Sequence, residues 1–416
     1  MAWVRRLLVP LLLAGLWAPP PAAAQTTETA LRSTLQQSMR AAGPASGAWV
    51  LNATERRTVF ARRSSVPRVL ASNTKLFTTA AALDHFGPDA AFETAVVASG
   101  ALAPDGTWHG DLVLRGGGDP AFGSRAFSTR AYGPGEDHVE GLADAVVAAG
   151  ITAVRGRVLG DETLLDPLRG GPDSGYRVSS YVGPLSALAF DRGLAGERGT
   201  AFQRSPPAYA AGRLDAALEA LGVRVSRKPA AGPAPPDAVP LASVTSPPMA
   251  RLVQVTNKRS DNYFAEMLLK NLGASAGGQG STAAGARVAA AYARTLGARP
   301  NLADGSGLSE ANLSSPRDVV RLLDGLSRRP DFPRFLDSLA VAGRDGTLRD
   351  RMRRSRARGR CQGKTGSLLG VSTLSGYCTA RDGDRLVFSF LMNRVNTASA
   401  RRLQDRMAGA LAASGG

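Results

Sequence analysis

The chain has 416 residues and a formal net charge of +17, because 51 Lys and Arg stand against 34 Asp and Glu. With 44% hydrophobic and 20% charged residues, its composition is that of a globular protein and excludes a disordered or collagen-like chain. Three His and two Cys are too few for a multi-ligand zinc or iron–sulfur site, and we expect no cofactor.

The N-terminus has the pattern of a secretory signal. Arg5 and Arg6 precede an apolar run over 7–18, and three alanines at 22–24 offer a small-residue cleavage site. The apolar run is too short to span a bilayer. We therefore expect residues 1–24 to be a signal peptide, with an uncleaved N-terminal anchor as the alternative. An exported protein this basic meets anionic surfaces.

Hydrophobic periodicity then predicts a region of helices and strands up to position 91 and a different, strand-rich region after it. Up to position 91, the sequence predicts a helix over Glu28–Met39, strands over Ala48–Asn52 and Arg57–Ala61, and a helix from about Ser72 to a stop at Gly87. From 92 to 240 it changes to short strands punctuated by Gly and Pro, including Gly110–Leu114 and Val154–Gly160, with helical patches at Gly141–Ala149 and Leu214–Leu221. The Pro- and Ala-rich stretch Lys228–Pro248 is typical of a linker.

The remainder looks like the second half of the first region. Helices are predicted over Met249–Thr256, Asp261–Leu272, Ala283–Leu296, Pro316–Leu326 and Ser399–Ala412. Three strands are predicted over Cys361–Gly366, Thr373–Ala380 and Arg385–Asn393. This order favours an α+β fold in which one antiparallel sheet is completed from both chain ends and flanked by helices. Residues 25–91 and 241–416 would form that domain, and 92–240 a large inserted strand-rich domain.

Three short motifs occur in order along the chain. Ser72-Asn-Thr-Lys75 lies at a helix start, Ser260-Asp-Asn262 between two helices, and Lys364-Thr-Gly366 on a strand. Each motif alone is a weak signal. The chain has only five lysines, however, and Lys75 is the only one with a Ser three positions before it. The three motifs in this order are therefore a strong signal.

The spacing suits nucleophilic catalysis. Residues i and i+3 share a helix face, so the Lys75 amine can reach the Ser72 hydroxyl and, when neutral, accept its proton. Burial or the like charge of Lys364 would keep Lys75 neutral. The backbone N–H groups of Ser72 and Ser367 would form an oxyanion hole.

The other motif residues suit substrate binding and proton transfer. Lys364 and the Thr365 hydroxyl offer a cation and a donor for a substrate carboxylate, on the strand segment that continues through Gly366 and Ser367. Ser260 could relay a proton to a leaving amine, and the Asn262 amide could hold a substrate carbonyl. Asp261 is expected to orient its loop or cap the following helix.

The two cysteines are expected to form a disulfide. In a hairpin in which Gly366 faces Thr373, the numbers of facing residues have a constant sum, and Cys361 then faces Cys378. An exported protein meets the oxidising conditions that allow the bond. Two buried free thiols are the alternative, and a one-residue slip of register would separate the side chains.

The motif triple is the signature of serine β-lactamases and penicillin-binding proteins. The chain resembles the low-molecular-mass class C penicillin-binding proteins, which are D-alanyl-D-alanine carboxypeptidases and endopeptidases. The resemblance covers essentially the whole mature chain and includes the segments 114–120, 183–188, 304–309, 342–348 and 363–372. It implies a penicillin-binding-protein/β-lactamase-like transpeptidase domain with a domain inserted between the first two motifs.

The leading hypothesis is an exported serine DD-peptidase, in the periplasm or another extracytoplasmic wall space, that forms an acyl-enzyme on Ser72. Its partners would be peptidoglycan stem peptides and β-lactam antibiotics, and no nucleic acid. A serine β-lactamase and a catalytically silent wall-binding scaffold are the alternatives. Catalysis by Ser306 is weighed and disfavoured, because no base lies beside it in the sequence. Seven arginines between Arg349 and Arg360 are read as a solvated face, with weak binding of an anionic wall or membrane surface as a further possibility.

Overall fold

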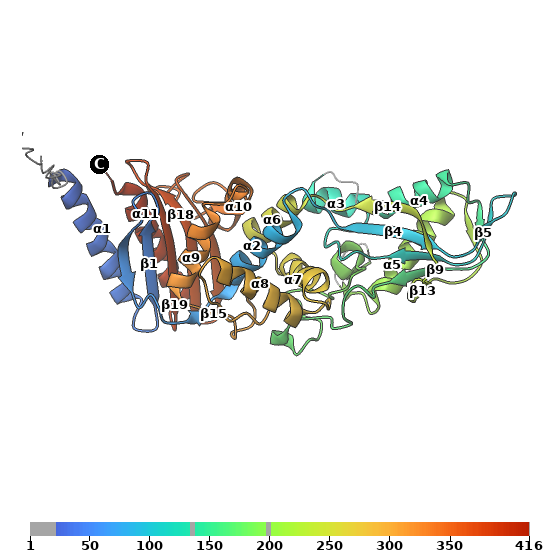
Figure 1. Ribbon diagram of the computed structural model, residues 1–416, viewed down its shortest axis with the longest axis horizontal. Helices are drawn as coiled ribbons and strands as arrows, with labels where there is room; N and C mark the ends of the chain where they lie inside the picture. The colour runs from blue at the N-terminus through green and yellow to red at the C-terminus, as the bar shows by residue number, and fades with distance from the viewer. Residues whose placement is uncertain (1–21, 134–137, 197–200, 416) are drawn as a thin grey trace, which may run out of the picture.

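The computed structural model describes residues 22–133, 138–196 and 201–415. Figure 1 shows an elongated molecule with a large sheet at one end, helices in the middle and a smaller α/β unit at the other end. The expected signal peptide lies outside the described residues, except for the three alanines that begin α1 (Ala22–Ala41). Within the described ranges, no helix is long and apolar enough to cross a membrane.

The large sheet has six strands in the order β16-β17-β18-β19-β1-β2. These strands are β1 (Gly47–Asn52), β2 (Arg57–Arg62), β16 (Ala340–Val341), β17 (Cys361–Leu368), β18 (Val371–Thr379) and β19 (Arg385–Asn393). Because β1 pairs antiparallel with β19, the expected sheet completed from both chain ends is confirmed. Helices α1 and α11 (Thr397–Ala413) pack together, α11 contacts β18, and α9 (Pro316–Leu326) packs on β1 and β19.

The β17–β18 hairpin has the expected register, with Gly366 facing Thr373 and Cys361 facing Cys378. Its strands continue further than expected, because Leu368 still pairs with Val371. The two residues Leu369 and Gly370 therefore make the turn, instead of a longer loop over 367–372. Gly370 has a φ of +70°, which a glycine adopts without strain.

A helical layer links the sheet to the rest of the molecule. It consists of α2 (Thr74–Phe86), α6 (Met249–Lys258), α7 (Asn262–Ala276), α8 (Thr282–Thr295) and α10 (Phe332–Ser338). Their apolar side chains share one core, which includes Phe77, Phe264 and Leu268. The predicted helices of this layer lie within four residues of their expected bounds, and α10 was not predicted.

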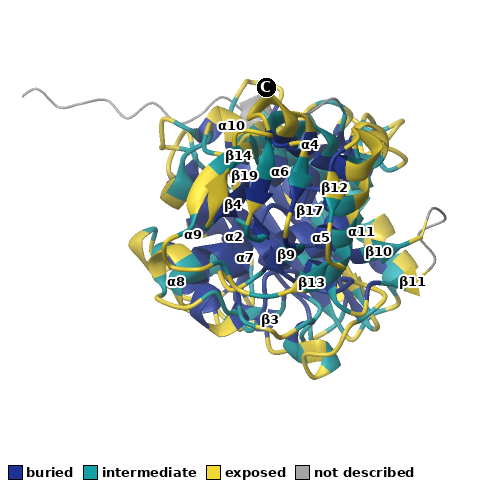
Figure 2. Ribbon diagram, turned by 90° about the vertical axis from the view of Figure 1, so that its right-hand side faces the viewer, coloured by how far each residue is buried: buried dark blue, intermediate teal, exposed yellow. Residues whose placement is uncertain are grey.

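The unit at the far end is built on two mixed sheets, with strand orders β13-β9-β7-β4-β14 and β12-β8-β6-β5. Its strands are β4 (Glu93–Ala98), β5 (Ala101–Leu102), β6 (Thr107–His109), β7 (Leu112–Arg115), β8 (Ala153–Val154), β9 (Val158–Asp161), β12 (Arg224–Val225), β13 (Ala230–Ala231) and β14 (Val239–Thr245). Its helices are α3 (Arg125–Tyr132), α4 (Val139–Ala148) and α5 (Pro206–Ala220). Viewed from this end, buried segments fill the middle of the molecule and exposed segments form the rim (Figure 2).

Two expectations for this unit were wrong. The stretch 228–248 is not a linker, because it contains β13 and β14, and β14 pairs along its whole length with β4. Its Pro240 is tolerated because β14 is an edge strand with a register shift at that point. Helix α5 starts earlier than predicted, since Pro206 and Pro207 occupy its first turn, where no N–H partner is needed.

We propose that the inserted unit comprises residues 93–245, since β4 and β14 are neighbouring strands of one sheet. This unit is named the insert below, and residues 22–92 with 246–415 are named the sheet domain.

Candidate active site

Ser72 lies in a 3₁₀ turn, η1 (Ala71–Asn73), that leads directly into α2. Ala71 adopts a φ of +46°, a conformation that costs about 1–3 kcal/mol for a residue with a side chain. Two glycines let other segments approach this turn. A Cβ on Gly307 would lie 1.9 Å from the Ala71 carbonyl oxygen, and one on Gly366 would lie 2.9 Å from the Ser72 nitrogen. The turn therefore lies between the segments that carry Gly307 and Gly366, and neither glycine can be replaced by a larger residue without displacing the turn.

Lys75 is fully buried one helical turn after Ser72. Its Nζ lies 3.1 Å from Ser72 Oγ, 2.7 Å from Asn262 Oδ1 and 2.6 Å from the Ser306 carbonyl oxygen. Burial lowers the pKa of Lys75 to about 8, against the opposing effect of the carboxylates of Asp304, Glu266 and Asp261.

This arrangement suits a neutral amine. A neutral lysine has two N–H donors and one lone pair, and the Asn262 and Ser306 oxygens can only accept. In the structure Lys75 Nζ also donates to Ser72 Oγ. Once the amine has lost a proton, its two remaining N–H groups can stay on the Asn262 and Ser306 oxygens, and its lone pair then faces Ser72 Oγ. The geometry therefore supports the sequence-based role of Lys75 as the base for Ser72.

The second motif faces the third. Ser260 has a φ of +59°, and its Oγ lies 2.8 Å from Lys364 Nζ. Lys364 also donates to the Thr365 carbonyl oxygen at 2.9 Å and is fully buried. Burial, together with the charge of Lys75, lowers the pKa of Lys364 well below its usual value. The influence found here is that of Lys75 on Lys364, the reverse of the expected one, because burial is what lowers the pKa of Lys75. The Lys364–Ser260 contact provides a direct path for a proton between the two side chains.

Asp261 and Asn262 connect this motif to the insert. Asp261 caps α7 by accepting a hydrogen bond from the Phe264 N–H at 3.1 Å, which confirms its expected structural role. It also pairs with Arg192 of the insert at 2.9 Å. The Asn262 amide nitrogen donates to the Tyr181 carbonyl oxygen, also in the insert, at 3.1 Å. Both halves of the Asn262 amide are therefore engaged, one with Lys75 and one with the insert.

The third motif runs along β17, beside the Ser72 turn. The Asn73 amide donates to the Lys364 carbonyl oxygen at 2.9 Å and so fixes β17 against η1. Thr365 Oγ1 bonds to Thr347 Oγ1 at 2.8 Å, and the exposed Ser367 Oγ accepts from Arg401 at 3.1 Å. The expected oxyanion donors, the N–H groups of Ser72 and Ser367, thus lie on two segments in close contact.

The structure adds residues that the motifs did not reveal. Glu266, on α7, is buried and accepts hydrogen bonds from the N–H groups of Gly305 and Ser306, the shorter at 2.8 Å. Asp304 accepts from Gly307 N–H at 2.6 Å and from Asn312 Nδ2 at 2.8 Å. Burial and mutual repulsion raise the pKa of Glu266, and burial raises that of Asp304.

The loop 304–307 thus presents the Ser306 carbonyl to Lys75, while the Ser306 side chain is buried. This contact supports the view that Ser306 is not the nucleophile. The only sequence signal for Glu266 was a charged residue on the apolar side of a predicted helix.

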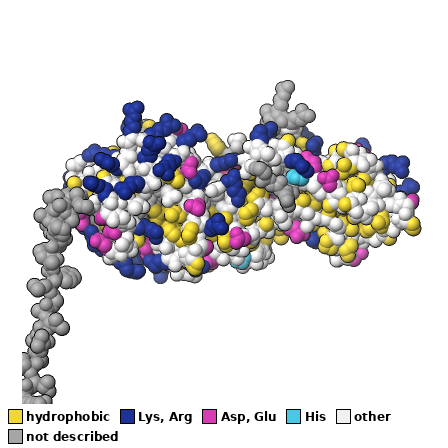
Figure 3. Space-filling view, turned by 90° about the horizontal axis from the view of Figure 1, so that it is seen from above, with side chains coloured by type: hydrophobic (Ala, Val, Ile, Leu, Met, Phe, Trp, Pro, Cys, Tyr) yellow, Lys and Arg dark blue, Asp and Glu magenta, His cyan; other side chains and the backbone are white. Residues whose placement is uncertain are grey.

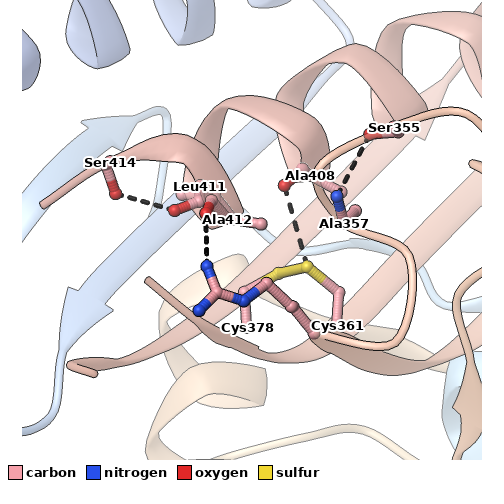
Figure 4. Close-up of a disulfide and its surroundings, with 9 residues drawn as sticks. Ser355, Ala357, Cys361, Cys378, Ala408, Leu411, Ala412 and Ser414 are labelled. Carbon is pink, nitrogen blue, oxygen red and sulfur yellow. Dashed lines mark hydrogen bonds between the residues drawn. A yellow bond between two sulfur atoms is a disulfide. The ribbon is translucent and has the colours of Figure 1, made fainter. Parts of the chain in front are cut away.

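The expected disulfide joins Cys361 to Cys378 at the far end of the same hairpin. It lies beneath α11, with Cys361 Sγ 3.7 Å from the Ala408 carbonyl oxygen (Figure 4). The covalent bond therefore ties β17, which carries the third motif, to β18. Among the described residues, no group of three or more His, Cys, Asp or Glu is arranged to hold a metal ion.

A strained serine turn, a buried lysine beside it and a lysine-bearing strand of an antiparallel sheet define the class of penicillin-binding, serine-acylating enzymes. The family model for the D-Ala-D-Ala carboxypeptidase 3 (S13) family matches residues 27–201 and 195–414. The chain belongs to this family, and its recognised class and fold are confirmed.

Individual relatives agree with this assignment. The chain is 30% identical to a D-alanyl-D-alanine carboxypeptidase of Actinomadura sp. (strain R39), over 89% of this chain and 81% of that one. It is 29% identical to carboxypeptidase DacB of Mycolicibacterium smegmatis, over 84% and 76% of the two chains. Penicillin-binding protein 4 of Haemophilus influenzae has the same fold, with a TM-score of 0.76 at 20% identity over 90% of this chain and 97% of that one.

Proposed function

We propose that this protein is an exported serine DD-peptidase that cleaves the terminal D-Ala-D-Ala bond of peptidoglycan stem peptides through an acyl-enzyme on Ser72. Membership of a D-Ala-D-Ala carboxypeptidase family gives the reaction class. The observation that carries the residue assignment is the Lys75 amine, buried 3.1 Å from Ser72 Oγ with two other acceptors around it.

The reaction follows from these contacts. Ser72 Oγ attacks the carbonyl carbon of the penultimate D-Ala while Lys75 accepts the hydroxyl proton. The N–H groups of Ser72 and Ser367 stabilise the negative oxygen that forms. Ser260, in contact with Lys364, passes a proton to the nitrogen of the departing D-Ala. Water then hydrolyses the acyl-Ser72 ester.

Substrate binding is assigned to β17 and Asn262. The Thr365 hydroxyl and Lys364 would bind the terminal carboxylate, whose negative charge favours the protonated form of Lys364. Gly366 lets the substrate-binding strand lie directly against the Ser72 turn. The second N–H of the Asn262 amide, besides the one that donates to Tyr181, would hold a backbone carbonyl of the stem peptide. β-Lactams would acylate Ser72 in place of the stem peptide.

The same proposal covers where the protein acts. The N-terminal signal pattern and the disulfide support action outside the cytoplasm, where such bonds persist. The positive net charge supports a weak association with an anionic wall or membrane surface.

The test is incubation of the purified protein with fluorescent penicillin, followed by mass spectrometry of the labelled peptide and a separate assay of D-Ala release from a soluble pentapeptide. We expect a long-lived adduct on Ser72 together with D-Ala release. Rapid turnover of the penicillin would indicate a β-lactamase, no label a silent scaffold, and an adduct on Ser260 or Ser306 a different nucleophile. Each of these three outcomes overturns the proposal.

A further inference from the structure

One surface of the sheet domain carries an unusual density of arginine. Eight of the 17 residues from Arg344 to Arg360 are arginines, and α11 adds Arg401, Arg402 and Arg406. All of them except Arg351 are exposed, and these ten exposed side chains are named the arginine face. Figure 3 shows Lys and Arg side chains gathered over the end of the molecule that the sheet domain forms.

The two segments form a single surface. Arg351, which is partly buried, pairs with Asp405 of α11 at 2.6 Å and holds the loop against the helix. Acidic side chains do little to neutralise this surface. Of the three acids in these segments, Asp405 is paired with Arg351 and Asp345 with Lys258, so only Asp350 contacts exposed arginines. The face therefore presents a strong positive potential.

The arginine face adjoins the candidate active site at two points. Within the loop, Thr347 bonds to Thr365 at 2.8 Å. At the start of α11, Arg401 donates to Ser367 Oγ at 3.1 Å. Both partners are residues of the strand that would bind substrate, so a polyanion on this face would lie next to Ser72.

We propose that the arginine face binds the carboxylate-bearing peptidoglycan polymer and holds it while one of its stem peptides reacts at Ser72. The inference rests on the proposed function, because it assigns the polymer as the substrate. Stem peptides carry free carboxylates along the polymer, and arginine forms paired, charge-assisted hydrogen bonds with carboxylates. An anionic membrane would need no contact with β17, whereas a bound polymer substrate must lead into the site.

The experiment removes four charges that make no ion pair with any described residue: Arg354, Arg356, Arg402 and Arg406 are changed to Gln together. The matched control changes four exposed arginines of the insert, Arg125, Arg155, Arg224 and Arg227, to Gln. A third variant carries Lys at the four positions of the arginine face. Each protein is tested for co-sedimentation with purified sacculi, with sacculi whose carboxylates are amidated, and with phosphatidylglycerol vesicles.

We expect the face variant to bind sacculi at least fivefold more weakly than the control variant, and the Lys variant to restore binding. Amidated sacculi should bind the unmodified protein as weakly as native sacculi bind the face variant, and added salt should weaken native binding. Penicillin labelling and hydrolysis of a soluble pentapeptide should stay unchanged in the face variant.

Equal sacculus binding by the face and control variants overturns the inference, as does failure of the Lys variant to restore binding. Binding that depends on the arginine face for vesicles but not for sacculi overturns it in favour of a membrane. Absence of penicillin labelling in the unmodified protein would instead refute the proposed function, and the sacculus assay does not depend on that result.

Discussion

The sheet domain and the insert differ in how their polar side chains are held. In the sheet domain, fully buried Lys75 bonds to Ser306, 231 residues away, and Asn73 bonds to Lys364, 291 residues away. In the insert, hydrogen bonds that involve a side chain join residues less far apart in sequence, and the longest separation among its described residues, between Ser99 and Asp237, is 138 residues. The site therefore forms only when segments from distant parts of the chain come together. The bonds within the insert join residues that are closer in sequence.

The two regions meet at α7. Besides the Arg192–Asp261 pair, Lys270 bonds to Asp166 at 2.6 Å and Asn271 donates to the Gly118 carbonyl oxygen at 2.8 Å. Helix α7 begins at the second motif and also carries Glu266. Arg251 of α6 and Arg259, which follows α6, also donate to the carbonyl oxygens of Tyr132 and Ala131 in the insert. The insert thus contacts the site through the two helices on either side of the second motif, and equivalent changes in the two regions should have unequal effects.

The largest contrast is expected between two serine substitutions. Ser72→Ala should reduce D-Ala release by about 10⁴-fold or more, because it removes the proposed nucleophile. Ser99→Ala, at a partly exposed serine of the insert that bonds to Asp237, should leave the rate unchanged. Steady-state hydrolysis of a pentapeptide and penicillin labelling measure both variants. Residual labelling of Ser72→Ala would show that another residue is acylated.

The disulfide gives the next contrast, since it closes a short hairpin of the sheet domain. Replacing Cys361 and Cys378 together by Ser should lower the free energy of unfolding by about 3 kcal/mol, as expected for a loop of this length. Urea unfolding of both proteins tests this value. Thiol titration of the unreduced, denatured parent protein should find no free thiol, and two free thiols would rule out the bond and the stabilisation assigned to it.

The pH dependence of acylation should show which region holds the group whose titration controls the rate. Since burial lowers the pKa of Lys75 to about 8 and its neutral form is the proposed base, the acylation rate should rise about tenfold per pH unit below 8 and level off above it. In the insert, burial raises the pKa of Asp191 to about 6. Stopped-flow acylation over pH 5–10 measures the profile, and a single inflection near 6 would place the controlling group in the insert.

The smallest effect should come from the contact between the regions. Arg192→Gln removes the ion pair with Asp261, which caps α7 beside Ser260, and should lower kcat/KM for a pentapeptide about fivefold. Arg213→Gln is the control in the same region, because Arg213 contacts the Phe190 ring and makes no ion pair with a described residue. Equal rates for the two variants would mean that the insert does not position the second motif.

The sequence determined those features that depend on local spacing. The Ser72–Lys75 spacing, the helix start at Pro316 and the facing of Cys361 and Cys378 follow from helix and strand periodicity, which tertiary contacts left unchanged. Strands near both chain ends likewise predicted one sheet formed from both ends of the chain, because each strand needed a partner for its apolar face.

The tertiary structure decided the electrostatics of the site and its link to the insert. The depressed pKa of Lys75 comes from its complete burial, and the segments that bury it, including those of Asn262 and Ser306, are distant in sequence. No local pattern specified that Glu266 would hold the Ser306 loop, or that β14 would pair with β4 across 140 intervening residues (99–238). Desolvation depends on every atom packed around a group, and those atoms are brought together only by the folded chain.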